Sequence, residues 1–202
     1  PAAAALAGCA STPPEEDPVQ IKLNDLDARV ARIERVVSNQ SLVQLAQNLD
    51  SVQAETRGSG FRIFSQFEED GIALALLASL GEGPRLFIDI GAGDGVFASN
   101  CANLAINLGF HGLFIDANAA LVERGRAFYA GHPDTSVYPP VFANAAVTPA
   151  TVNDLVAAAG FGGEIDFLSI DIDGNDYWVW EALTVVEPRV VLIETHPELG
   201  HR

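Results

Sequence analysis

The sequence predicts an α/β fold, a parallel sheet of about five strands wrapped by helices and preceded by a long coiled-coil helix. Three observations support this class. From residue 61 onward, short apolar runs alternate with helical segments, which is typical of a parallel sheet with helices on both faces. A glycine-rich turn follows the first apolar run, and residues 21–57 show heptad-like spacing of apolar side chains without Gly or Pro.

The composition of the 202 residues is that of a globular protein, with 49% hydrophobic and 19% charged residues. The net charge of −16 argues against nucleic acid as a partner and against attraction to an anionic membrane surface. No run of eighteen apolar residues predicts a bilayer span. The two cysteines, Cys9 and Cys101, indicate no disulfide framework or zinc site, and Cys101 is expected to be a buried thiol.

The first segment, residues 1–20, contains a targeting-type motif. Residues 6–9 (LAGC) match a bacterial lipobox, in which small residues precede the cysteine that receives lipid, and the Pro- and acid-rich residues that follow suit a flexible tether. The basic region and most of the apolar region of a signal peptide are missing, so an alanine-rich stretch with an incidental Cys9 is the alternative.

Residues 21–57 are expected to form an oligomerising coiled coil. The apolar residues of its two halves, which are separated by a slip near residues 38–41, are Leu23, Leu26, Val30, Ile33 and Val37, then Leu42, Leu45, Leu49 and Val52. The sequence from Leu26 to Val37 resembles the N-terminal trimerising helix of the Tol-Pal-associated cell division coordinator, a periplasmic TolA-binding protein. The resemblance implies a homotrimer and an envelope location, with membrane contact only through lipid on Cys9. The tetratricopeptide repeats of that family are absent, so an oligomerising helix of other ancestry is the alternative.

A Gly-Ser-Gly joint at residues 58–60 precedes the expected domain at 61–202. Apolar runs predict strands and periodic segments predict helices, and Pro139 and Pro140 interrupt the third strand. Thr148 is the expected cap of a helix that has Pro149 at its first position. The expected strands are 86–90, 112–116, 136–142, 164–171 and 189–194, and the expected helices are 96–108, 119–129, 148–159 and 177–183.

The turn after the first strand is the candidate cofactor site. Asp89 is followed by Gly91, Gly93 and Gly95, which let the backbone turn tightly and approach a ligand without a Cβ in the way. The second strand ends in Asp116, where a carboxylate can accept both ribose hydroxyls of an adenosine. The dinucleotide fingerprint places its third glycine one residue later, at the position of Val96, so a pyrophosphate is not the expected ligand group.

The pattern Asp89-x-Gly91-x-Gly93-x-Gly95 resembles motif I of class I S-adenosylmethionine-dependent methyltransferases, which have a Rossmann-like sheet. The resemblance implies S-adenosylmethionine as cofactor, bound by these residues and Asp116, with Asn144 near the adenine. The ammonium and sulfonium charges of that cofactor suit acids such as Asp89. A glycine turn that serves only the fold is the alternative.

A second block, residues 167–180, contains several acids. An EF-hand is excluded because Gly174 comes too early and Ala182 stands where a bidentate glutamate belongs. The block resembles the I-D-x-x-G-x-[ED] segment of FkbM-type methyltransferases. Residues 65–71 (SQFEEDG) resemble the opening of one branch of that group, although Glu68 stands where glycine is usual. The resemblance spans about residues 61–199.

By that resemblance Asp171 and Asp173 would face the transferred methyl group, near an acceptor oxygen or nitrogen of a small molecule or glycan. A carboxylate there could take the proton of the acceptor. Together with His196 these acids could hold a divalent ion, although we assign no metal, and His196 is alternatively a general base or a solvated loop histidine. Trp178 and Trp180 are expected to be packing residues rather than a substrate platform.

Two functions are open on this evidence. The first is methyl transfer, or cofactor binding alone, because a class I methyltransferase sheet has seven strands and the sequence shows about five. The second is a lipid-anchored, oligomerising envelope protein with an inert globular end. The first function implies the cytoplasm and the second the periplasm or outer membrane. A fusion, a chimeric reading frame or a constructed sequence would explain how the two segments meet at residues 58–60.

Overall fold

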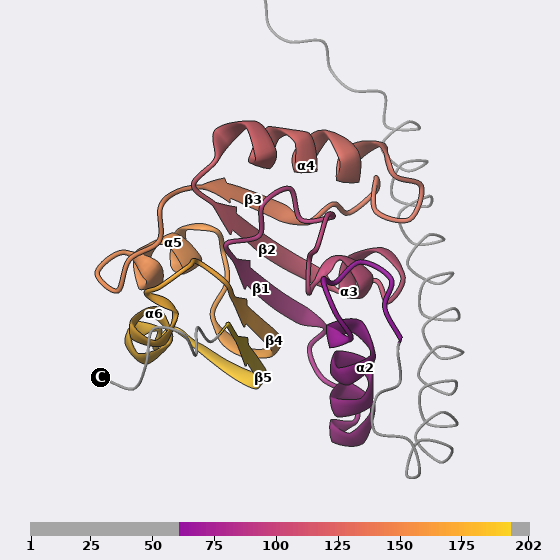
Figure 1. Ribbon diagram of the computed structural model, residues 1–202, viewed down its shortest axis with the longest axis horizontal. Coiled ribbons are helices and arrows are strands. Elements are labelled where there is room, and N and C mark those ends of the chain that lie inside the picture. The colour runs from indigo at the N-terminus through magenta and orange to yellow at the C-terminus, as the bar shows by residue number, and fades with distance from the viewer. Residues whose placement is uncertain (1–60, 195–202) are drawn as a thin grey trace, which may run out of the picture.

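The computed structural model describes residues 61–194, which form a five-stranded sheet with helices on both faces (Figure 1). The predictions for residues 1–60 and for His196 lie outside these described residues. The strands are β1 (Leu86–Ile90), β2 (His111–Asp116), β3 (Val141–Asn144), β4 (Gly163–Ile170) and β5 (Val186–Ile193). The helices are α2 (Glu69–Leu80), α3 (Ala102–Ile106), α4 (Ala119–Gly131), α5 (Val152–Ala158) and α6 (Asp176–Ala182).

The strand order is β3-β2-β1-β4-β5, and every neighbouring pair is parallel. The chain runs outward from β1 through β2 to β3 and then returns to place β4 on the other side of β1. The strand order therefore reverses between β1 and β4, and the crevice at such a point is where ligands bind in open α/β sheets. The Rossmann-like α/β class predicted from the sequence is confirmed.

Successive side chains of a strand point to opposite faces of the sheet, and helices cover both faces, so the sheet has a core on each side. Phe87 and Phe114 belong to the core under α2, α3 and α4, and their rings meet edge to face at 5.0 Å. Ile88 and Leu168 belong to the core under α5 and α6. Each of these four side chains is fully buried, and such burial stabilises the fold by roughly 1.5–3 kcal/mol per side chain.

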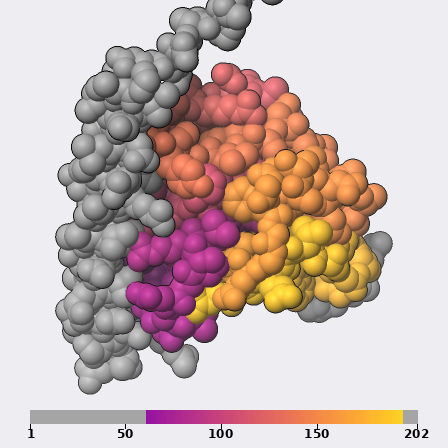
Figure 2. Space-filling view, turned by 180° about the vertical axis from the view of Figure 1, so that it is seen from behind, coloured from indigo at the N-terminus to yellow at the C-terminus, as the bar shows by residue number. Residues whose placement is uncertain are grey.

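Arg189 of β5 ties the end of α2 to the sheet. One guanidinium nitrogen donates to Asp166 Oδ1 at 2.6 Å and another donates to the Leu80 carbonyl at 2.7 Å. Asp166 is 2% exposed and also accepts the amides of Arg85 and Leu86, at the start of β1. The view from behind accordingly shows the purple start of the described chain beside its yellow end (Figure 2).

Four predicted elements differ from the structure, and one of them is the fifth strand, which begins at Val186 rather than at residue 189. The helix expected at 96–108 is reduced to α3, because the loop after β1 is held in turns up to Cys101 and Ala98 has a φ of +54°. The strand expected at 136–142 starts at Val141, directly after the two prolines, because proline lacks the N–H that a ladder needs. The helix expected at 148–159 begins at Val152, with Thr151 rather than Thr148 at the N-cap position.

Cys101 is buried, as predicted, and burial raises the pKa of its thiol well above the ordinary value. No helix in the described part of the chain has the length and apolar character needed to cross a bilayer.

Candidate ligand-binding site at the glycine turn

The turn after β1 packs tightly against the backbone at Gly91 but has free space beside Gly93. All three predicted glycines have positive φ, +86° at Gly91, +59° at Gly93 and +68° at Gly95. A Cβ at Gly91 would lie 1.7 Å from the carbonyl oxygen of Asp171, so this residue is needed where β1 and β4 come together. A Cβ at Gly93 would have only Leu121 Cδ1 nearby among the described residues, at 3.9 Å, so there is open space on that side of the backbone.

Asp116, at the end of β2, points back to this turn. Its Oδ2 accepts the amide of Gly93 at 2.8 Å, and its Oδ1 accepts the amide of Asn118 at 2.7 Å. An ionised carboxylate has about four lone-pair sites, so about two remain for hydroxyl groups of a ligand. The structure therefore brings together the acid and the glycine that the sequence singled out.

Asp89 lies in β1 just before the turn and is only 3% exposed. Burial raises the pKa of its carboxyl to about 6, although hydrogen bonds from Ser169 and Ser99 oppose this, and repulsion from Asp116 adds to it. The Ser99 hydroxyl donates to Asp89 Oδ2 at 3.2 Å. A positive charge near the turn would stabilise the ionised form of this carboxyl.

Asn144 ends β3 at the same edge of the sheet, paired with Asp116 in the strand register. Its side-chain amide donates to the backbone carbonyl of Asp116 at 2.9 Å, and the residue is exposed. The predicted cofactor residue thus borders Asp116, at the outer end of the site.

Two buried residues that the sequence analysis did not select hold the turn in shape. Asp94 Oδ1 accepts the amides of Val96 and Phe97 at 3.0 and 2.9 Å, and its Oδ2 pairs with the Arg124 guanidinium at 2.7 Å. Burial acts to raise the pKa of Asp94, but the amides of Phe97 and Val96 and the charge of Arg124 outweigh it and lower the pKa. Tyr129 donates its hydroxyl to the Gly95 carbonyl at 2.6 Å. Arg124 and Tyr129 both lie on α4, about thirty residues from the turn, so no local pattern indicates these contacts.

The predicted catalytic acids lie after β4 and meet a third carboxylate. One oxygen each of Asp171, Asp173 and Glu194 lies within 4.8 Å of the others. Although Asp171 is exposed, partial desolvation of its carboxyl, a hydrogen bond with Glu194 and the charges of Glu194, Asp173 and Asp89 raise its pKa to about 7. The Asp171 amide donates to the Ile90 carbonyl at 2.9 Å, which fixes these acids beside the glycine turn. Such oxygens can take a proton from an acceptor or contact a divalent cation.

The prediction that Trp178 and Trp180 are packing residues is wrong. Both lie on α6, where they are 57% and 43% exposed, because the helix buries Val179 and Asp176 instead. Their closest ring partner among the described residues is Tyr177, itself exposed, with centroids at 5.1 and 6.1 Å.

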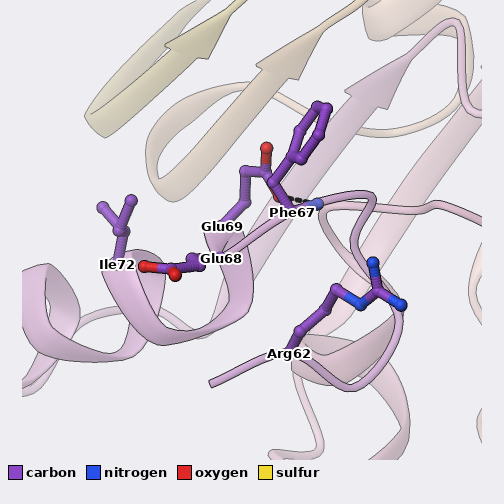
Figure 3. Close-up of a pocket in the computed structure, with 5 residues that line it drawn as sticks. All are labelled: Arg62, Phe67, Glu68, Glu69 and Ile72. Carbon is purple, nitrogen blue, oxygen red and sulfur yellow. Dashed lines mark hydrogen bonds between the residues drawn. The ribbon is translucent and has the colours of Figure 1, made fainter. Parts of the chain in front are cut away.

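A separate hollow lies at the start of α2, and the described residues that line it are Arg62, Phe67, Glu68, Glu69 and Ile72 (Figure 3). The Glu69 carboxylate bends back to accept the Phe67 amide at 2.7 Å, shown by the dashed line in the figure. No residue of the glycine turn or of the acid cluster is among these, so this hollow is not the predicted site.

No protein-family model and no curated protein matches the chain. Fold and site together define an α/β protein with a Rossmann-like parallel sheet, whose glycine turn and strand-end acids meet at one edge.

Proposed function

We propose that the domain binds S-adenosylmethionine and transfers its methyl group to an oxygen or nitrogen of a small molecule or glycan. One observation carries the proposal, the 2.8 Å hydrogen bond from the Gly93 amide to the Asp116 carboxylate. This bond places the Asp116 carboxylate, at the end of β2, directly beside the Gly93 backbone. Such an arrangement suits the ribose of an adenosyl group. Asn144, which pairs with Asp116 in the strand register, would then lie near the adenine.

The charge of the site supports a cationic adenosyl ligand. The pKa of Asp89 is raised to about 6 and that of Asp171 to about 7, so their ionised forms are held at a cost in free energy. A sulfonium or ammonium nearby would offset part of this cost, whereas a phosphate would increase it. A neutral or positive ligand is therefore favoured over a dinucleotide.

When bound, S-adenosylmethionine supplies an electrophilic methyl group. Asp171 is the best placed base, because a group with a pKa of about 7 can both accept and release a proton near neutral pH. Its carboxylate oxygen would take the proton of the attacking hydroxyl or amine. Asp173 and Glu194, within 4.8 Å, would favour the protonated product state through their negative charge.

The binding step is tested by titration calorimetry against S-adenosylhomocysteine and NAD. We expect the first to bind and the second not to bind. Asp116→Ala should weaken S-adenosylhomocysteine binding about tenfold or more, because two hydrogen bonds to an ionised group are lost. Asp154→Ala, which removes an exposed acid from α5, is the matched charge control and should leave binding unchanged. Absence of binding by a chain with an intact circular dichroism spectrum would remove the proposal.

The transfer step is tested separately, with methyl-labelled S-adenosylmethionine and a panel of hydroxyl- and amine-bearing sugars. Asp171→Asn should keep S-adenosylhomocysteine binding within about threefold and lower any transfer at least a hundredfold. Equal transfer by the variant would show that Asp171 is not the base.

A further inference from the structure

We infer that Asp94 is a specificity-determining residue that makes the glycine turn reject adenosine ligands carrying a phosphate group, such as ADP. The inference rests on the proposed adenosyl-binding function and deepens it by fixing the sign of charge that the ligand carries beyond its ribose.

A pyrophosphate binds a glycine turn through free backbone amides and through the start of the helix that follows. Most of these amides are already in use here. Six of the seven amides from Gly91 to Phe97 donate to protein oxygens: Gly91 and Ala92 to the Ile115 carbonyl, Gly95 to the Ala92 carbonyl, Gly93 to Asp116, and Val96 and Phe97 to Asp94. The next helix, α3, begins only at Ala102.

Asp94 takes the place that a bound anion would occupy. Its carboxylate accepts the two amides that follow Gly95, and it is 9% exposed. Arg124 holds the carboxylate from the other side through two nitrogens that both contact Asp94 Oδ2, Nε at 2.8 Å and Nη2 at 2.7 Å. Such charge-assisted hydrogen bonds are stronger than neutral ones. The Arg124 side chain is 62% exposed, but its charge is already paired with Asp94 and a phosphate would have to compete for it.

The position of α4 keeps this arrangement close to the turn. A Cβ on Gly125, the residue after Arg124, would lie 2.4 Å from the carbonyl oxygen of Asp94, so the two backbones are in direct contact. A diphosphate entering the turn would have to displace the Asp94 carboxylate and would also face the Asp116 carboxylate. Adenosine alone, or adenosine joined to a cationic chain, meets neither obstacle.

The test compares adenosine with ADP, because the two share base and ribose and differ only in the diphosphate. Titration calorimetry on the full chain gives the ratio of the two Kd values. We expect the original chain to bind adenosine at least tenfold more tightly than ADP. Asp94→Ala should shift the ratio about tenfold toward ADP, because the amides of Val96 and Phe97 and the Arg124 guanidinium are released.

Asp94→Asn separates the charge from the hydrogen bonds, because its amide oxygen can still accept from Val96 and Phe97 while the negative charge is gone. It should shift the ratio toward ADP by about threefold, less than the alanine variant. Asp154→Ala removes the same charge from an exposed position on α5 and should leave the ratio unchanged. If Asp94→Ala does not fold by circular dichroism, the asparagine variant decides.

An unchanged ratio in the folded variants, or tighter binding of ADP than of adenosine by the original chain, would overturn the role of Asp94. Binding of S-adenosylhomocysteine by the original chain reports on the proposed function alone. Gain of ADP binding by Asp94→Ala in a chain that never binds S-adenosylhomocysteine would uphold the role of Asp94 and remove the methyl-donor proposal.

Discussion

Gly91 occupies the point where the glycine turn touches the tip of β4, so its replacement by alanine tests the geometry of the site directly. The residue has a φ of +86°, and a Cβ there would lie 1.7 Å from the Asp171 carbonyl oxygen and 3.0 Å from Ile172 Cγ2. The first contact is with backbone, which cannot rotate away. Relief of the clash requires the tips of β1 and β4 to separate.

The free energy of unfolding should fall by about 3–5 kcal/mol in Gly91→Ala. Alanine at positive φ costs about 1–2 kcal/mol. Separation of the strand tips adds about 1 kcal/mol for the weakened hydrogen bond from the Asp171 amide to the Ile90 carbonyl, which is 2.9 Å long, and about 1–2 kcal/mol for repacking. The same shift disturbs the glycine turn and with it the contact of Gly93 with Asp116, so binding of S-adenosylhomocysteine should weaken as well.

Gly160 provides a matched control, because it has the same φ of +86° but nothing within 4 Å of an added Cβ. Gly160→Ala should therefore cost only the backbone strain of about 1–2 kcal/mol. Urea unfolding of both variants, followed by circular dichroism, measures the difference. Equal losses of stability would show that the close approach of the two strand tips does not constrain residue 91, and the reasoning would fail.

Three further predictions concern charge and assembly. Asp171→Asn should raise the melting temperature at pH 8 and flatten its pH dependence. The folded protein takes up a proton near pH 7 that the unfolded chain binds only near pH 4, so the stability of the original chain rises as the pH falls between these values. Melts at pH 5 and pH 8 check this, and an unchanged slope would contradict it. Arg189→Met should cost about 2–3 kcal/mol in urea unfolding by leaving buried Asp166 without its cation, whereas Glu164→Gln, which alters an exposed partner 3.7 Å away, should cost at most about 0.5 kcal/mol. Chemical crosslinking should yield trimers that disappear on deletion of residues 1–57, and monomers in both cases would count against the predicted coiled coil.

The strands that lie in the middle of the sheet could be predicted closely from the sequence. Strands β1, β2 and β4 begin and end within one residue of the predicted bounds, because strands buried on both faces are continuous apolar runs. The edge strand β5 was harder, since it starts at Val186, three residues before the predicted start. Pro188 argues against a strand in a sequence-based prediction, although proline is tolerated on an edge strand.

The loop after β1 could not be predicted, because one contact distant in sequence and one local side-chain turn override its helical pattern. Ser65 forms a parallel bridge with Ala98, and Asp94 holds the amides of Val96 and Phe97. Asp116 was predictable because its distance from the glycines is fixed by the length of one strand–helix–strand unit. The pairing of Asp94 with Arg124 was not, because it depends on the packing of α4.

The topology also explains why so many acids converge at one edge. Parallel strands end on the same side of a sheet, so Asp89, Asp116, Asp171 and Glu194, each at or near the end of a different strand, lie at the same edge although they are far apart in the sequence. Their burial and mutual repulsion raise the pKa of Asp89 and Asp171, and the free energy of this arrangement falls when a cation enters and rises when an anion does. The hydrogen bonds of Asp94 act in the same direction, because they remove the backbone amides that would otherwise compensate an anion. Under the proposed function, the strand-end acids and the hydrogen-bonded amides of the turn would both favour a cationic ligand over an anionic one.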